Sequence, residues 1–365
     1  MEANVQCGTA FGLHHLFKFL DAAAKKISPP EEVLVEGTTF QVQSRLGEGG
    51  FSYVYLVREE PDLRGEDFAL KRMLLPDGED EDEDDFDFDL FGKTAVEREI
   101  NVMRMMNHAN VLPLLKHSIE SGNDAKATAT QRRRANMVFP VYAEGTMLDW
   151  CLRKGEENRE KTFSTKQLLS IGLQVASALR YMHELDIPLA HRDVKPGNVL
   201  LESSMESSSG VKAVLMDFGS TRRARCEIKN RNQALVVQER AARECTAPFR
   251  APELFDTPSS CKIDERVDVW SLGCLLFSGV HGGHSPFELA MHQTGGSVAL
   301  AALSGKVDWP LSRSGESDES QGEDPKQYSK YSLAPVKDVV TYLLQKDWTT
   351  RPFAKDMEER IGKYL

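Results

Sequence analysis

The stretch HRDVKPGN, residues 191–198, places an acid, a lysine and an amide within six positions. The carboxylate of Asp193 can accept a proton from an attacking hydroxyl, and Lys195 can neutralise a phosphoryl group in transfer. Asn198 offers an amide oxygen to a metal ion. Because phosphoryl transfer depends mainly on positioning and charge neutralisation, this stretch predicts a site for a nucleotide's terminal phosphate and a hydroxyl acceptor.

Groups that such a site needs lie upstream in a workable order. The glycine-rich turn GEGGF, with Gly47, Gly49 and Gly50, joins the predicted strands FQVQSRL and SYVYLVRE. Glycines there let backbone N–H groups approach anionic oxygen, although such turns are also common in ordinary hairpins. Twenty-one residues after Gly50, Lys71 lies in a third predicted strand, DFALKRM, where its ammonium group would bind phosphate.

Lys71 requires an acidic partner, and a predicted helix, TAVEREINVMRMM, offers two. Glu99 is the natural counterion and Glu97 is its competitor. The two glutamates lie about 200° apart around a helix, so they cannot both face the same strand. Further along, Asp217 in LMDFGS offers a carboxylate to the same metal ion as Asn198.

The order of predicted elements indicates an α+β fold with a small β-rich lobe and a larger, mostly helical one. Residues 1–37 form an N-terminal extension, 38–143 the small lobe, and 144–365 the large lobe. A capping box from Ser164 to Gln167 opens a long predicted helix, and DVWSLGCLLFSGV predicts a buried one. No apolar run reaches the ~18 residues of a membrane span.

Charge and cysteine content limit the classes of partner. The net charge is −11, but residues 77–90 alone hold ten acidic residues and no basic ones, which leaves about −1 for the rest. No dense basic face is present, so nucleic acid is not an expected partner. The six scattered cysteines favour reduced thiols of a cytosolic or nuclear compartment over disulfides or a zinc site.

Three segments stand apart from the predicted core. The acidic run 77–90 predicts a solvated insertion, with a docking site for a basic partner as the alternative. Residues 312–332 are polar and low in complexity, which indicates an exposed loop. The N-terminal extension places Leu13, Leu16, Phe17 and other apolar residues on one helical face. That face suits either an interfacial membrane helix or a helix packed on the domain.

Six motifs in register resemble the signature set of eukaryotic protein kinases: GEGGFSYV, FALK, a helix glutamate, HRDVKPGN, DFG and APE. With DVWSLG and Arg351 the likeness covers nearly the whole chain. LGEGGFSYV, LMDFGS, TAPFRAPELF and IDERVDVWSLGC are similar to the Numb-associated kinase family. Within it, GGSVALA resembles the small Golgi-associated branch named for N-terminal myristoylation and palmitoylation.

The resemblance implies a bilobal fold, ATP and Mg²⁺ as cofactors, and protein substrates with serine or threonine acceptors. Lys71 then pairs with Glu99, which precedes His108 by nine residues as in kinases generally, and Asp193 is the catalytic base. Lys195 contacts phosphate, and its place two residues after Asp193 is typical of serine/threonine kinases. The remaining roles that the resemblance implies are nucleotide contacts at Leu46, Gly47, Glu48, Gly49, Gly50, Phe51, Ser52, Val54, Ala69, Phe139, Pro140, Tyr142 and Asn198, magnesium ligands at Asn198 and Asp217, an activation segment with Arg192 and Thr246, and structural positions at Glu253, Asp268 and Arg351.

Departures from the family pattern leave questions open. Ser52 replaces the third glycine but still offers a backbone N–H. A helical insertion at about 222–245 favours an activation segment built in its active shape. The alternative is that Arg192 awaits a phosphate on Ser220, Thr221 or Thr246. Glu2 stands where myristoylation requires glycine, so that lipid cannot be inferred.

Two other function classes compete with the enzyme. A pseudokinase scaffold would keep the fold but lack part of the set Lys71, Glu99, Asp193, Asn198 and Asp217, and none of these is missing. An adaptor acting through the acidic run and the N-terminus is compatible with either. The expected location is cytoplasmic. The family resemblance adds the expectation of peripheral attachment to the Golgi or another membrane. A secretory-pathway role, autophosphorylation and palmitate on Cys7 are expectations of the same kind.

Overall fold

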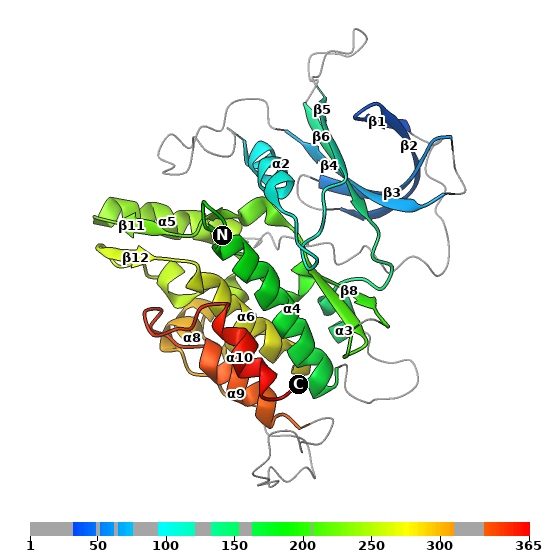
Figure 1. Ribbon diagram of the computed structural model, residues 1–365. Coiled ribbons are helices and arrows are strands. Elements are labelled where there is room, and N and C mark those ends of the chain that lie inside the picture. The colour runs from blue at the N-terminus through cyan, green and yellow to red at the C-terminus, as the bar shows by residue number, and fades with distance from the viewer. Residues whose placement is uncertain are drawn as a thin grey trace, which may run out of the picture. The chain divides into compact units, whose positions relative to one another are not determined.

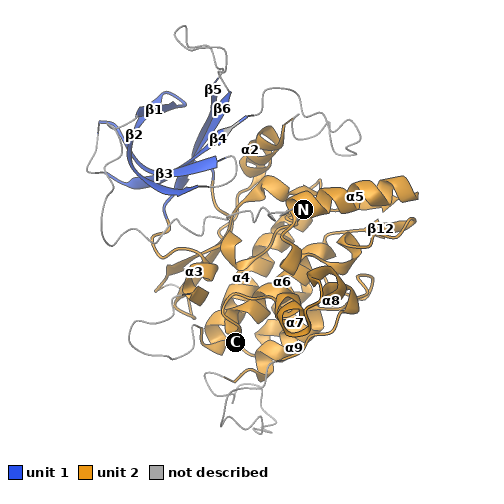
Figure 2. Ribbon diagram, turned by 180° about the vertical axis from the view of Figure 1, so that it is seen from behind, with its two compact units in different colours: residues 1–80, 114–141 blue, residues 81–113, 142–365 orange. Residues whose placement is uncertain are grey.

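The structure, a computed structural model, describes residues 32–48, 52–61, 65–75, 94–120, 133–152, 163–205, 207–309 and 332–365. The chain divides into two compact units (Figure 2). The first holds residues 1–80 and 114–141, and the second holds residues 81–113 and 142–365. The first is built from strands and the second mainly from helices, so the predicted α+β class is confirmed.

The first unit is a six-stranded antiparallel sheet in the order β1-β2-β3-β4-β6-β5. Its glycine-rich turn joins β2 to β3, as the alternating apolar pattern predicts. The strands are β1 (Glu32–Val35), β2 (Thr38–Glu48), β3 (Ser52–Glu59), β4 (Asp67–Leu74), β5 (Lys116–Glu120) and β6 (Arg134–Pro140).

The two faces of this sheet have different contents. One face carries a buried cluster made by Val33, Val35, Phe40, Val42, Val57, Leu70 and Val138. Because side chains alternate along a strand, Ala69 and Lys71 of β4 lie on the opposite face from Leu70. The register pairs Lys71 with Val54 and Ala69 with Phe139, so these four predicted nucleotide contacts share that second face.

Several boundaries differ from the sequence prediction. Strand β1 lies inside residues 1–37, which the sequence assigned to an extension, because its alternating residues Val33 and Val35 complete the sheet's core. Strand β5 was not predicted, since KHSIE carries few apolar residues at an exposed edge. Most of the predicted extension, the acidic run 77–90 and almost all of the loop 312–332 lie outside the described residues.

The second unit is built around long helices, and Figure 1 shows α4, α6, α9 and α10 packed together. Its helices are α2 (Ala95–Met105), α3 (Met147–Leu152), α4 (Thr165–His183), α5 (Arg231–Glu244), α6 (Arg266–Val280), α7 (Pro286–Thr294), α8 (Val298–Ser304), α9 (Ala334–Leu343) and α10 (Asp356–Gly362).

Short strands and 3₁₀ turns carry the chain between these helices. The strands are β7 (Leu189–Ala190), β8 (Val199–Ser203), β9 (Val211–Leu215), β10 (Arg222–Arg223), β11 (Cys226–Ile228) and β12 (Cys261–Ile263). The 3₁₀ turns are η1 (Pro196–Asn198), η2 (Phe218–Ser220), η3 (Ala247–Phe249) and η4 (Pro252–Leu254). In the predicted insertion 222–245, the stretch NRNQALVVQERAAREC forms α5, as its sequence predicts. Strands β10 and β11 precede α5 and pair with β7 and β12.

The core of the second unit explains why its helices form where the sequence placed them. Ser164 and Gln167 make the predicted capping box at the start of α4. Helix α6 is buried from Val267 to Gly279 without interruption, which accounts for its mostly apolar sequence. Gly172 of α4 allows the close approach of α6, since a Cβ there would lie 2.7 Å from Leu276 Cδ2. Among the described residues, no helix has both the length and the apolar character needed to cross a membrane.

Candidate active site

The turn between β7 and β8 brings Asp193, Lys195 and Thr246 into direct contact. The Lys195 Nζ donates to Asp193 Oδ2 at 2.7 Å and to Thr246 Oγ1 at 2.8 Å. The other carboxylate oxygen, Asp193 Oδ1, accepts from the backbone N–H of Thr246 at 2.8 Å. Thr246, which is 51 residues from Lys195 and 53 from Asp193 in sequence, therefore forms one hydrogen-bonded group with them.

Asn198 completes this group and has one unused acceptor. Its Nδ2 donates to the Asp193 carbonyl oxygen at 2.8 Å and to Oδ2 of the same residue at 3.2 Å. Its Oδ1 is buried and accepts no hydrogen bond. A buried amide oxygen without a donor is costly, and a hard cation would satisfy it. The residues present therefore fit Mg²⁺ at this position.

Asp217 follows the same turn in the chain and is held close to it. The N–H of Met216 donates to the Asn198 carbonyl oxygen at 3.0 Å. Asp217 itself has a left-handed backbone, with φ of 66°, which a non-glycine residue adopts only when its surroundings impose it. This backbone fixes the direction in which the carboxylate leaves the chain, as expected for a second metal ligand.

The buried carboxylate of Asp268 in α6 holds the backbone of this turn by hydrogen bonds. Its oxygens accept the backbone N–H of His191 at 2.8 Å and of Arg192 at 2.7 Å. The ring Nε2 of His183 lies 3.0 Å from Asp268 Oδ2. Burial alone raises the pKa of Asp268, but hydrogen bonding to His183, the charges of His183 and His191, and the Arg192 N–H outweigh it. The pKa therefore lies below its ordinary 3.8.

The two glutamates of α2 have separate roles in the structure. Glu97 makes a capping box with Thr94, whose Oγ1 accepts the Glu97 N–H at 3.1 Å and whose own N–H donates to the Glu97 carboxylate at 3.2 Å. Glu99 is buried, and its Oε2 would lie 3.6 Å from a Cβ added at Gly219. Asp217 Oδ1 would lie at the same 3.6 Å. Glu99 thus points to the DFG segment while Glu97 caps its helix.

Four of the predicted nucleotide contacts of the first unit, Val54, Ala69, Lys71 and Phe139, lie on one sheet face, as described above. Of the others, Leu46, Gly47 and Glu48 end β2, Ser52 opens β3 and Pro140 ends β6. Gly49, Gly50 and Phe51 lie outside the described residues. Tyr142 belongs to the second unit, where burial and then the charge of Glu202 raise its pKa. The pairing of Lys71 with Glu99 stays a prediction.

Glu253 and Arg351 form a fully buried ion pair in the second unit. Arg351 Nη1 and Nη2 donate to the two carboxylate oxygens at 2.7 Å and 3.1 Å. The guanidinium also donates to the carbonyl oxygens of Arg266 and Gln345 and packs over the Trp270 ring. A bidentate pair with additional hydrogen bonds is the geometry that makes a buried arginine tolerable.

Comparison with known proteins places this arrangement in a family. The family model described as Protein kinase domain matches residues 40–360. The chain belongs to the protein kinase family. Serine/threonine-protein kinase 16 of Homo sapiens is 34% identical over 269 residues, covering 74% of this kinase and 77% of its own length. A probable serine/threonine-protein kinase of Dictyostelium discoideum is 33% identical over 327 residues, covering 74% and 83% respectively.

A more distant relative covers more of the chain. The serine/threonine-protein kinase ppk13 of Schizosaccharomyces pombe is 26% identical over 360 residues, or 90% of this kinase. The kinase belongs with the serine/threonine protein kinases, and the predicted bilobal kinase fold and the enzyme class are confirmed. The family uses ATP, usually with Mg²⁺, which agrees with the unused oxygen of Asn198.

Sequence reasoning missed two groups that support the site of the kinase. His183 is the last residue of α4 and hydrogen-bonds Asp268, but a histidine at a helix end carries no distinguishing pattern. Glu244 pairs with Arg222 across the activation segment, at a distance in sequence that no local period reveals. Both contacts arise only from tertiary packing.

The depressed pKa of Asp268 predicts an acid-dependent stability. Because the folded pKa lies below the unfolded value of about 3.9, the stabilisation by this carboxylate is present above pH ~4 and is lost as pH falls through the folded value. Asp268→Asn should lower the free energy of unfolding at pH 5, and its gap to the natural protein should narrow towards pH 3. Urea unfolding at several pH values measures this, and a gap that stays constant between pH 5 and 3 contradicts it.

Proposed function

We propose that the kinase transfers the γ-phosphoryl group of ATP to serine or threonine hydroxyls of protein substrates. The observation that carries this proposal is the group formed by Asp193, Lys195, Asn198 and Thr246, with the unused Asn198 oxygen beside it. A pseudokinase scaffold would have no need for a buried amide acceptor next to a positioned carboxylate. The geometry therefore favours catalysis over scaffolding.

The contacts assign a task to each member of the group. Both Asp193 oxygens are oriented by donors, one by Lys195 and one by the Thr246 N–H, so the carboxylate is held in one rotamer. It would accept the proton of the attacking hydroxyl. Lys195 stands 2.7 Å away and would offset the charge that develops on the phosphoryl oxygens. Asn198 and Asp217 would hold Mg²⁺, which together with ATP supplies the activated phosphoryl group and screens its charge.

Asp193→Asn should lower kcat by about 10²–10⁴-fold, because an amide cannot take the proton. Binding of ATP should be retained, since the proposed contacts of Asp193 are with the acceptor hydroxyl. The assay uses the full chain with Mg²⁺, labelled ATP and a general acceptor protein, and the hydrolysate is resolved into phosphoserine, phosphothreonine and phosphotyrosine. ATP-dependent protection against thermal unfolding reports binding.

Asp308→Asn is the matched control, because Asp308 is exposed and forms its ion pair with the neighbouring Lys306 on the surface of the second unit. It should leave the rate unchanged. Asp217→Ala and Lys71→Ala should abolish labelling. Label that persists at the natural rate in Asp193→Asn would refute the proposed base, and a folded, ATP-binding natural protein that never labels a substrate would favour the scaffold.

The activation segment supports activity without prior phosphorylation. Ser220 Oγ donates to the carbonyl oxygen of Glu244 at 2.7 Å, and Thr221 is 2% exposed. Arg222 pairs with the Glu244 carboxylate at the end of α5. Arg192 donates to the Arg223 carbonyl oxygen at 3.2 Å. Of the hydroxyls that could carry a phosphate, Ser220 is thus hydrogen-bonded and Thr221 is buried. The neighbouring Arg222 is already paired with Glu244 at the end of α5.

Ser220→Ala and Thr221→Val should therefore keep the initial rate of substrate phosphorylation. Valine matches the shape of threonine, and the Thr221 hydroxyl makes no hydrogen bond that replacement would remove. The rates are compared after phosphatase treatment, so that phosphate acquired during expression is removed. A natural protein that loses its rate on phosphatase treatment and regains it on preincubation with ATP, when either variant does not regain it, would show that phosphorylation switches the enzyme on.

The Numb-associated family, its Golgi-associated branch and a secretory-pathway role are proposals supported by the motif resemblance. Two segments would carry such roles: the acidic run 77–90 for a basic partner and the N-terminal extension for a peripheral membrane surface. Deleting 77–90 should change partner binding, and deleting residues 1–31 should reduce flotation with lipid vesicles. Both deletions should leave peptide phosphorylation intact, and unchanged binding and flotation would remove these roles.

A further inference from the structure

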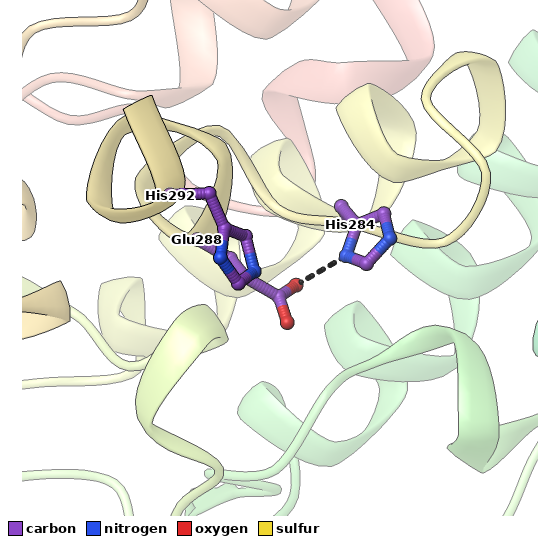
Figure 3. Close-up of side chains that lie close together, drawn as sticks. All are labelled: His284, Glu288 and His292. Carbon is purple, nitrogen blue, oxygen red and sulfur yellow. Dashed lines mark ion pairs between the residues drawn. The ribbon is translucent and has the colours of Figure 1, made fainter. Parts of the chain in front are cut away.

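Three side chains on the exposed side of α7 gather within reach of one ion. His284, Glu288 and His292 each offer one ligand atom, and these atoms all lie within 4.8 Å of one another. Figure 3 shows the carboxylate of Glu288 directed at the His284 ring, where Nδ1 and Oε2 are 3.0 Å apart. Among the residues that the structure describes, this is the only group of three such ligands.

The backbone explains how residues spaced by four come together. Glu288 and His292 are one turn apart on α7 and share a face. His284 precedes the helix and is joined to it by Ser285, whose backbone is extended, with φ of −71° and ψ of 161°. Ser285 then caps the helix by accepting the Glu288 N–H at 3.1 Å. The chain therefore leaves the helical path at Ser285, and His284 lies beside Glu288 of the first turn.

The opposite side of α7 packs against the core, so the backbone that carries Glu288 and His292 is held in place. Phe287 is fully buried and stacks on Trp270 of α6 with ring centroids 5.0 Å apart. Helix α7 also packs against η3, the turn that directly follows Thr246. A metal ion that stabilises α7 would therefore act on a helix in contact with η3, which directly follows Thr246 of the proposed active site.

We propose that His284, Glu288 and His292 bind a divalent transition metal ion of the zinc class. Two imidazoles and one carboxylate are a donor set that zinc accepts, whereas Mg²⁺ and Ca²⁺ prefer oxygen ligands alone. Donors around a tetrahedral zinc lie about 3.4 Å apart for bonds of ~2.1 Å, so no pair has to close by more than about 1.4 Å.

That closure is open to these side chains because none of the three is buried. His284 is 48% exposed and Glu288 is 26% exposed. Three protein ligands leave the fourth coordination position of the ion for water. The metal–ligand bonds would link His284, before α7, to His292 in its second turn. The role we assign is structural, as a clamp on α7. It is separate from the Mg²⁺ that Asn198 and Asp217 would hold, so failure of the proposed catalytic function would not affect it.

The experiment uses the full chain, stripped of metal by a chelator and titrated with Co²⁺ and then Zn²⁺. The natural protein should take up one more equivalent of Co²⁺ than His292→Gln or Glu288→Gln, with the visible absorption of a four-coordinate site. Loss of one ligand should weaken Zn²⁺ binding by more than about tenfold. Zn²⁺ at about 100 times its Kd should raise the Tm of the natural protein by about 5 °C, an increase that both variants lose.

The control is His117→Gln, which removes another histidine–glutamate pair outside the core, His117 Nδ1 with Glu36 Oε1 at 2.9 Å. Among the described residues this pair has no third ligand, so the variant should keep full Co²⁺ uptake. His292→Cys should keep binding and add a thiolate-to-cobalt absorption, which places the ion at that residue. Equal uptake by the natural protein and both triad variants would overturn the proposal, as would a loss in His117→Gln equal to theirs.

Discussion

The site depends on one buried carboxylate. Asp268 accepts the backbone N–H groups of His191 and Arg192 and contacts His183, so it binds the chain just before the proposed base. Arg192 has a φ of 66°, a conformation that costs a non-glycine residue about 1–2 kcal/mol. The two charge-assisted hydrogen bonds offset that cost. They turn the chain so that the carboxylate of Asp193 faces Lys195 and Thr246.

The carboxylate can perform this task because α6 is packed in the core of the second unit. The helix is buried along almost its whole length, and its Trp270 is held between Phe287 on one side and the Arg351 guanidinium on another. Arg351 is in turn fixed by Glu253, four residues from Phe249 of η3. The activation segment and the catalytic turn thus rest on the same helix. A change in α6 would be felt at both, whereas a change in the surface loops would not.

Much of this could be predicted because the decisive signals are local. The capping box at Ser164, the apolar run of α6 and the alternating strands of the first unit each follow from the period of their own segments. The choice between Glu97 and Glu99 also has a local answer. Thr94 stands three residues before Glu97, which is the spacing of a capping box, and this leaves Glu99 for the DFG segment. The four residues from Thr94 to Glu97 are therefore enough to assign different roles to the two glutamates.

The remainder required tertiary contacts. His183 and Asp268 are 85 residues apart, and nothing local marks the histidine as a partner of a buried acid. In HSPFELAMH the three proposed ligands are spaced by four residues, but a zinc prediction based on cysteines alone does not include this pattern. Whether those residues converge depends on the extended backbone at Ser285, because a continuous helix would separate His284 from His292 by about 12 Å along its axis. The ligand types are therefore a property of the sequence, and their convergence is a property of the fold.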